Sequence, residues 1–251
     1  MNDFDASTWI GKWPFAFVDA HTPKSLASHL KAHGIRRALV SPLDAVFAQA
    51  PGSANRELLR VTRGIAAIVP VPVINLALAN WREELDAVAA DPRVQAVRLL
   101  PAYHNFRLGL RAVDELAAEV IRRRLRLIVQ ARLIDERHEF HAMNIKPVKP
   151  AEFVAFVARH PRLRVMASGF LRSEILAIAK KCPHALFDLS FAEWHETVRH
   201  LLAKAPVRQL CFASHTPFLI TAAARAKLDP SGLPESKLAA IASRNLERWL
   251  A

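Results

Sequence analysis

Two histidines follow apolar segments of strand length, and their side chains are well suited to proton transfer. His104 lies shortly after one such segment, and His215 lies just after another. An imidazole titrates near physiological pH, so we expect His215 and His104 to act as general base and acid. Asp135, which follows a third apolar segment, is a further catalytic candidate.

Arginine supplies a second kind of chemistry at the same segment ends. A guanidinium binds a carboxylate or a phosphate through two parallel hydrogen bonds. We therefore expect Arg98, Arg132 and Arg137 to bind a small anionic substrate, with Ser7 and Trp9 of the first segment beside them. An equally weighted alternative is that Arg98 or Arg132 neutralises a buried carboxylate, the acids concerned being Asp5, Asp135 and Asp188.

A pair of histidines offers a speculative metal site. His138 and His141 are three residues apart and would share one face if their loop began a helical turn. Together with His104 or His215 they could hold zinc. Loop histidines are more often exposed or bonded to the backbone, so our main expectation is a site without a metal or other cofactor.

These side chains need a scaffold that brings the segment ends together. Apolar runs of strand length alternate with segments of helical period, and the alternation repeats eight times with short connections. The expected strands are residues 3–9, 37–41, 65–73, 94–100, 126–132, 163–167, 185–189 and 209–213. Most are nearly continuous apolar runs, as is typical of buried parallel strands.

The expected helices have apolar residues three or four positions apart. In the first, Thr22 is the N-cap, Pro23 the first helical residue and Gly34 the residue past the end. The expected helices are residues 23–33, 54–63, 81–89, 112–123, 150–160, 172–181, 192–204 and 235–250.

This alternation predicts a single (βα)₈ TIM barrel over residues 1–251, with its active site at the C-terminal ends of the strands. A doubly wound open sheet would show the same alternation, but the first strand is not followed by the Gly-rich turn of that fold. The long connections 133–149 and 216–233 both leave the C-terminal ends of strands.

Five short motifs occur in order along the chain, at residues 4–11, 97–101, 166–169, 212–218 and 241–250. In order and spacing they resemble the amidohydrolase superfamily, specifically the amidohydrolase-related branch of metal-dependent TIM-barrel hydrolases and decarboxylases. The resemblance covers nearly the whole chain. It implies a metal held by a His-x-His pair on strand one, a His on each of strands five and six, and an Asp on strand eight.

The residues at those positions depart from the pattern. The His-x-His pair falls on Ser7 and Trp9, and the strand-eight Asp falls on His215. The strand-five His falls on Gln130 or its neighbour Arg132, and the strand-six His on Ala167. Most of these side chains are poor ligands for a divalent first-row metal. We therefore expect degenerate metal-ligand positions.

The charge of the chain favours an anionic partner. Lys plus Arg number 35 and Asp plus Glu 23, which gives a net charge of +12. Such a field attracts carboxylates, phosphates and nucleic acid. The densest basic cluster, residues 122–126, has the position of a solvated helix end, so we rank nucleic acid last. A homo-oligomer is compatible with the sequence, which locates no interface.

The cysteine content and the apolar segments bear on the cellular location of the protein. Cys182 and Cys211 are the two cysteines, too few for a disulfide framework, and we expect buried free thiols. We expect neither a membrane span nor a signal peptide, and therefore a cytoplasmic protein.

The leading hypothesis is an amidohydrolase-like hydrolase, or a related acid/base lyase or decarboxylase, that acts on a small anionic substrate. The alternative is a catalytically lapsed barrel that binds or senses a small ligand. Ser168 and Ser214, which follow predicted strands six and eight, lack the Gly-x-Ser-x-Gly turn of a nucleophilic serine, and this disfavours a serine hydrolase. Four aromatic residues, Trp9, Trp13, Phe15 and Phe17, could line a pocket or cover the barrel rim.

Overall fold

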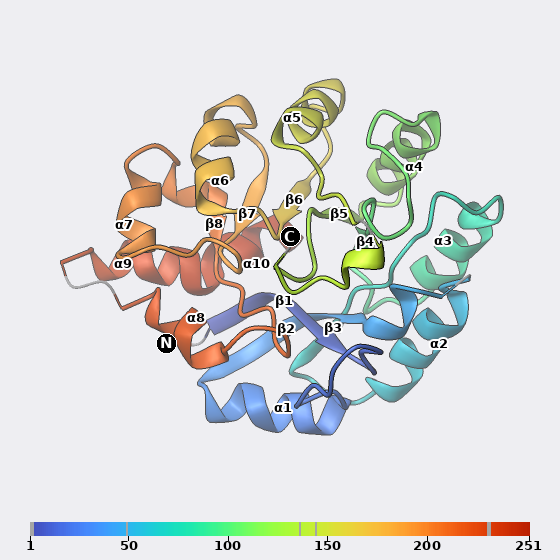
Figure 1. Cartoon of the computed structure of the whole chain (residues 1–251), viewed down its shortest axis with the longest axis horizontal. Helices are drawn as coiled ribbons and strands as arrows, with labels where there is room; N and C mark the ends of the chain where they lie inside the picture. The colour runs from blue at the N-terminus through green and yellow to red at the C-terminus, as the bar shows by residue number, and fades with distance from the viewer. Residues whose placement is uncertain (1–2, 49, 136, 144, 230–231) are drawn as a thin grey trace.

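The computed structural model describes residues 3–48, 50–135, 137–143, 145–229 and 232–251. Over these residues eight strands and ten α-helices succeed one another, and the helices surround the strands (Figure 1). The strands are β1 (Asp3–Ile10), β2 (Ile35–Pro42), β3 (Ile68–Pro70), β4 (Ala96–Leu99), β5 (Arg126–Gln130), β6 (Val165–Ser168), β7 (Leu186–Asp188) and β8 (Leu210–Cys211). All eight expected strands are present, although several are shorter than the apolar runs that predict them.

The strands form a closed parallel barrel. They pair in two arcs, β1-β2-β3 and β4-β5-β6-β7-β8. Single bridges join the arcs, Thr8 with Thr216 on one side and Val73 with Arg98 on the other. The backbone N–H of His215 also donates to the carbonyl oxygen of Ser7 at 2.9 Å. The predicted TIM barrel is therefore confirmed, and the open doubly wound sheet is excluded.

The helices follow the strands as the sequence pattern predicts. Thr22 caps the first helix, its Oγ1 accepting a hydrogen bond from the backbone N–H of Ser25 at 3.1 Å. The helices are α1 (Pro23–Ala32), α2 (Gly52–Val61), α3 (Trp81–Ala89), α4 (Arg111–Arg122), α5 (Pro150–Arg159), α6 (Arg172–Ile178), α7 (Thr197–Leu202), α8 (Thr221–Ala226), α9 (Glu235–Ala239) and α10 (Asn245–Leu250).

Three expectations about helices were wrong. The helix expected at 192–204 begins only at α7, because Glu196 has a left-handed backbone (φ 48°). The helix expected at 235–250 is divided by a π-helical segment, Ala240–Arg244. The connection expected at 216–233 contains α8, whose six residues are too few to show a helical period.

The two ends of the barrel differ in chemistry. At the end where the strands begin, apolar side chains such as Phe4 and Met166 pack with Leu246 and Trp249 of α10. The carbonyl oxygen of Trp249 accepts a hydrogen bond from Nε of Arg126 at 2.7 Å, which fixes α10 across this end. Polar interior side chains are therefore found toward the other end, the barrel mouth, where the strands finish.

Within the described ranges, no helix combines the length and the apolar character needed to cross a membrane.

Candidate functional site

Polar side chains from six strands or their ends meet inside the barrel mouth. Each is at most 1% exposed. Because side chains alternate along a strand, residues two apart on β1 face the same way. We call this group the central polar cluster, and its members are Asp5, Ser7, Arg98, Gln130, Ser168, Asp188, Ser190, Ser214 and His215.

Arg98, on β4, lies at the centre of these contacts. Its Nη1 donates to Oγ of Ser7 at 3.2 Å and to Oε1 of Gln130. Its guanidinium carbon lies 4.5 Å from the centroid of the Trp9 ring, a cation–π contact. Burial lowers the pKa of Arg98 to about 10, an effect opposed by the carboxylates of Asp188 and Asp5. The side chain therefore keeps its positive charge at neutral pH.

His215 uses both of its ring nitrogens in hydrogen bonds. Nε2 lies 2.7 Å from the carbonyl oxygen of Leu133, so this nitrogen carries the proton. Nδ1 lies 3.3 Å from Oγ of Ser7 and accepts from that hydroxyl. Burial lowers the pKa of His215 to about 4, although the bond to Leu133 opposes the shift. The ring is a neutral part of a hydrogen-bond chain that runs from Arg98 to Leu133.

Two buried carboxyl groups complete the cluster. Oδ1 of Asp5 accepts from the backbone N–H groups of Ser7 and Ser214, both at 3.0 Å. Burial raises the pKa of Asp5 to about 7, and hydrogen bonds from Ser214 and Ser7 oppose the shift. Asp188, on β7, accepts from the hydroxyls of Ser168 and Ser190. The carboxyl of Asp5 therefore holds its proton to a much higher pH than an exposed aspartate does.

Several polar atoms around the cluster are buried without a hydrogen-bond partner among the described residues. They are Nε and Nη2 of Arg98, Nε1 of Trp9 and Oδ2 of Asp5. A buried donor without a partner is costly, and such groups bind water or a ligand atom in many proteins. Three of the four atoms are nitrogen donors, so the chemistry they favour is the recognition of an anion.

Two of the predicted substrate-binding arginines are already paired. Arg132 donates to both carboxylate oxygens of Glu174, at 2.8 and 2.9 Å, and joins the end of β5 to α6. Arg137 pairs with Asp135 at 2.7 Å on an exposed loop, and its hydrogen bonds hold the pKa of Asp135 below its usual range. These ion pairs place Arg132, Arg137 and Asp135 outside the central polar cluster. Arg132 does pair with an acid, but the acid is the partly buried Glu174 and none of the three expected, Asp5, Asp135 and Asp188.

His104, which was expected to act together with His215, is bonded to the backbone at Ala45 instead. Nε2 of His104 lies 3.2 Å from the carbonyl oxygen of Ala45, and burial lowers the pKa of His104. No contact between His104 and His215 is present in the described part of the chain. His138 is exposed. The side chain of His141 lies outside the described residues, so the speculative site at His138 and His141 stays a prediction.

Aromatic side chains cover the barrel mouth above His215. Trp13 contacts Phe218 with ring centroids 5.0 Å apart, and Phe218 contacts His215 at 5.7 Å. Rings from the loops after β1, β2, β4 and β5 extend the contacts outward. We call this group the aromatic cap, and its members are Trp13, Phe15, Phe47, Tyr103, Phe140 and Phe218. The expectation that aromatic residues near Trp9 cover the rim is met by Trp13 and Phe15.

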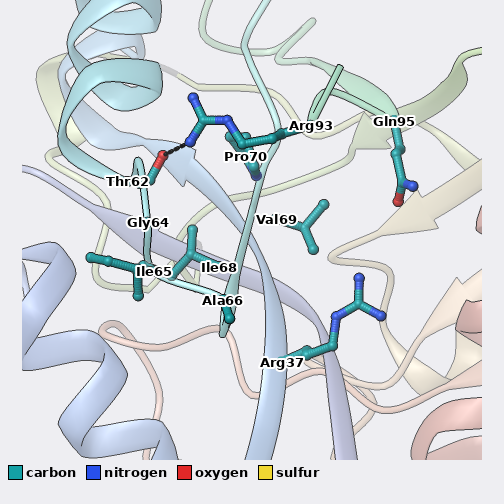
Figure 2. A pocket seen from close by; sticks show the side chains of 10 residues that line it. All are labelled: Arg37, Thr62, Gly64, Ile65, Ala66, Ile68, Val69, Pro70, Arg93 and Gln95. Atoms are coloured by element: carbon teal, nitrogen blue, oxygen red, sulfur yellow. Dashed lines mark hydrogen bonds between the residues drawn. The ribbon is translucent and has the colours of Figure 1, made fainter. Parts of the chain in front are cut away.

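The surface holds pockets at both ends of the barrel. At the mouth, one of about 460 Å³ is lined by Trp13 and Phe15 of the aromatic cap, with Lys12 and His21. Another, of about 370 Å³, lies at the opposite end, beside the starts of β2, β3 and β4 (Figure 2). There Arg93 is held by Thr62 and Asp91. The second pocket lies far along the barrel from the central polar cluster.

The residues present do not fit the metal that the resemblance implies. Ser7 Oγ and Gln130 Oε1 both accept from Arg98, so the oxygen atoms nearest the expected position already bind a cation. Within the described residues, no three His, Cys, Asp or Glu side chains converge as a metal site would require. Trp9 offers no ligand atom, because its indole nitrogen is a donor only.

Sequence reasoning missed several members of this site. The sequence places Asp188 and Ser190 at the end of strand seven, but neither was chosen as a site residue, yet both face the cluster. Asp188 and Ser190 are two residues apart at the end of a strand, as Asp5 and Ser7 are. This spacing could have indicated that both side chains face the barrel interior. Phe47 and Phe218 of the aromatic cap carried no such signal, because they come from separate loops.

Solved structures share this fold over nearly the whole chain. A 2,6-dihydroxybenzoate decarboxylase in complex with 2,6-dihydroxybenzoate has a TM-score of 0.73 at 13% identity, covering 99% of this chain and 98% of that chain. A dihydroxybenzoic acid decarboxylase from Polaromonas, with bound manganese and the inhibitor 2-nitroresorcinol, has 0.71 at 11%, covering 100% and 97%. An amidohydrolase from Mycobacterium avium subsp. paratuberculosis has 0.65 at 17%, covering 92% and 75%.

No protein-family model matches the sequence, and no curated protein does. At these identities the structural likeness establishes the fold, and function has to be argued from the site. The chain shares its TIM-barrel fold with these two decarboxylases and this amidohydrolase, and a TIM barrel is what the sequence predicts.

Proposed function

We propose that this chain binds a small anionic molecule, of the aromatic carboxylate class, at the barrel mouth without the help of a metal. The observation that carries the proposal is that the fully buried guanidinium of Arg98 has two nitrogens, Nε and Nη2, without a partner among the described residues. A planar guanidinium with two free donors matches the geometry of a carboxylate.

The surroundings of Arg98 favour an aromatic ligand. Trp9 stacks on the guanidinium, and the aromatic cap lies above His215. Aromatic rings prefer to pack against other rings, edge to face or offset. A ligand ring would take the space that the cap side chains Trp13 and Phe218 now fill, and the neighbouring pocket of about 460 Å³ offers a route for displacing them. One structure with this fold contains 2,6-dihydroxybenzoate, an aromatic carboxylate.

Binding without turnover is the form of this function that the geometry supports best. A general base needs a free nitrogen within reach of its substrate. His215 has none, because Nε2 and Nδ1 are both engaged with the protein. His104 keeps an unpartnered Nδ1, but its Nε2 is bonded to the carbonyl oxygen of Ala45 and the ring lies outside the central polar cluster. Arg132 and Arg137 are committed to ion pairs. This corresponds to the catalytically lapsed alternative.

A binding experiment tests the proposal directly. Calorimetric titration in the presence of a chelator would use benzoate, 2,6-dihydroxybenzoate and benzamide, the last having the ring without the charge. We expect both carboxylates to bind and benzamide not to bind. Arg98→Lys should weaken binding by about tenfold or more, because it removes a bidentate contact. Arg37→Lys is the matched control at the far end of the barrel and should bind as the unmodified chain does.

Two results would contradict this proposal. One is equal binding of benzamide and benzoate, and the other is equal weakening by the Arg98 and Arg37 substitutions. Both variants must first show the native melting transition, so that a loss of binding is not a loss of folding.

A metal-independent acid–base reaction is the second candidate, and Asp5 is the observation that favours it. Its pKa of about 7 and its unpartnered Oδ2 suit a group that gives or takes one proton at neutral pH. Chromatography of the carboxylates after long incubation distinguishes the candidates. Product that forms with the unmodified chain and is lost in Asp5→Asn would favour an enzyme, and unchanged ligand would favour a binding protein.

A further inference from the structure

Three of the positions at which the family resemblance places metal ligands contact the guanidinium of Arg98. The two positions of the His-x-His pair hold Ser7 and Trp9, and the strand-five position holds Gln130. Ser7 accepts a hydrogen bond from Arg98 at 3.2 Å, Gln130 accepts a second, and Trp9 stacks on the guanidinium at 4.5 Å. Three residues from two different strands, β1 and β5, thus converge on one organic cation.

The strand-six position, Ala167, packs in the apolar core with Val129 and does not take part, but the strand-eight position is also tied to this cation. The strand-eight position holds His215, and its Nδ1 accepts from the Ser7 hydroxyl that itself accepts from Arg98. Asp188 and Asp5 lie near enough for their charges to act on Arg98. A positive charge enclosed by acids and by acceptor side chains is the electrostatic arrangement of a metal centre, here built around a side chain.

We propose that the Arg98 guanidinium is the resident cation of this barrel, occupying the place of a divalent metal ion and excluding one. Two features enforce the exclusion. The oxygen atoms of Ser7 and Gln130, at two of the ligand positions, already accept hydrogen bonds from Arg98, and two positive charges a few ångströms apart in a buried site repel strongly. The absence of metal-ligand side chains and the presence of Arg98 then have one explanation. The positive charge of a side chain takes the place of the positive charge of a bound metal ion.

The competing explanation is that Arg98 merely fills space at the barrel centre. Charge and volume can be separated by substitution. Lysine keeps the charge without the planar donors, and methionine is close to lysine in length and flexibility but has no charge. If the charge of residue 98 stabilises the fold, it does so by balancing the charges of Asp5 and Asp188, and lysine should replace arginine in part. If volume matters, methionine should serve at least as well, because exchanging a buried ion for an apolar side chain is often neutral.

The first experiment compares Arg98→Lys with Arg98→Met by urea denaturation at pH 7.5. We expect the midpoint urea concentration to fall in both variants and to fall clearly further in Arg98→Met. The matched control is the same pair of substitutions at Arg37, a half-buried arginine that stacks on Phe4. There we expect lysine and methionine to differ little. An Arg98→Met variant as stable as Arg98→Lys would overturn the proposal.

The second experiment asks whether removing Arg98 opens the place to a metal. Ser7→His, Trp9→His and Gln130→His would be combined twice, once with Arg98 retained and once with Arg98→Ala. After incubation with zinc and gel filtration, elemental analysis should find about one zinc per chain only where Arg98 is absent, since three imidazoles suffice to hold zinc. Equal zinc in the two combinations would overturn the proposal, as would stoichiometric zinc in the unmodified chain.

Each of the two experiments can decide the question without the other. Should the triple substitutions fail to fold, the lysine and methionine comparison and the zinc content of the unmodified chain still decide the question. None of these measurements uses an organic ligand, so the proposed binding function can fail while the replacement of the metal stands, and the reverse also holds.

Discussion

Asp5 and His215 respond to burial in opposite ways, and together they govern how the central polar cluster depends on pH. The pKa of Asp5 is raised from 3.8 to about 7, so the native state holds a proton that the unfolded chain releases earlier. The pKa of His215 is lowered from 6.5 to about 4, so the native ring stays neutral where the unfolded ring is charged. Between pH 4 and 6.5 the two groups therefore oppose each other in the free energy of unfolding.

Replacing Asp5 isolates one of these contributions. Because its folded pKa is raised, the stability it contributes is complete below pH 3.8 and is lost as pH rises toward 7. Asp5→Asn removes that loss, so the unmodified chain should lose stability relative to Asp5→Asn between pH 4.5 and pH 7.5. Urea denaturation at three pH values in that range measures the difference.

Asp135→Asn is the control for this prediction. The pKa of Asp135 is lowered by its hydrogen bonds with Arg137, so its contribution is lost only as pH falls below the range used. The gap between Asp135→Asn and the unmodified chain should stay flat from pH 4.5 to 7.5. A gap for Asp5→Asn that is equally flat would show that Asp5 titrates normally.

At this scale the sequence predicted which residues face the mouth better than what they do. Arg98, Ser7, Trp9 and His215 all lie inside the barrel mouth, and the sequence points to them because strand ends are visible as the ends of apolar runs. Their partners were not visible. Whether a guanidinium meets Glu174 from a helix or Gln130 from a strand depends on side-chain packing between elements far apart in the sequence.

The connection from β6 to α6 depends on a close approach between neighbouring strand ends. Gly169 has a left-handed backbone (φ +74°), and a Cβ there would lie 2.5 Å from the carbonyl oxygen of Arg132 and 2.8 Å from Nε2 of Gln130. Neither neighbour can retreat easily. The Arg132 carbonyl is backbone, and Gln130 is held by Arg98.

Two glycines allow this close approach to be measured. Gly64 has a similar backbone (φ +80°) with nothing within 4 Å of an added Cβ. Alanine at either position carries the left-handed backbone cost of about 1–2 kcal/mol. Gly169→Ala adds overpacking of about 1–3 kcal/mol, so its free energy of unfolding should fall further than that of Gly64→Ala. Equal losses in urea denaturation would contradict the described contact.

Regular elements were predictable where a strong periodic signal matched the local geometry. The expected strands and most helices are confirmed, and α3 has the predicted bounds, Trp81–Ala89. The exceptions lie where local conformation breaks the period, as at Glu196 and in the π-helical segment Ala240–Arg244. Such local departures from the helical period depend on tertiary contacts. One such contact is made by the side-chain amide of Asn245, which donates to the carbonyl oxygens of Val207 and Leu210.

The whole barrel is closed at one end by α10 and at the other by the aromatic cap. Trp249 of α10 is 7% exposed and packs with the apolar interior residues, among them Phe4. Trp249→Ala should lower the free energy of unfolding by about 3–5 kcal/mol, the usual result of removing a large buried side chain.

Trp194 provides the comparison for the same substitution at the surface. Its side chain is 59% exposed. Trp194→Ala should change the free energy of unfolding by no more than about 0.5 kcal/mol. Chemical denaturation of the two variants measures both values, and similar losses would mean that α10 does not seal the barrel as described.

The tryptophans of the mouth give this protein a built-in optical reporter. Trp13 belongs to the aromatic cap, and Trp9 lies directly on the Arg98 guanidinium. Both are almost fully buried, so their emission should be blue-shifted at rest and should move to longer wavelength whenever water reaches them. Any event that lifts the cap could therefore be followed in real time, in an unlabelled chain, by intrinsic fluorescence.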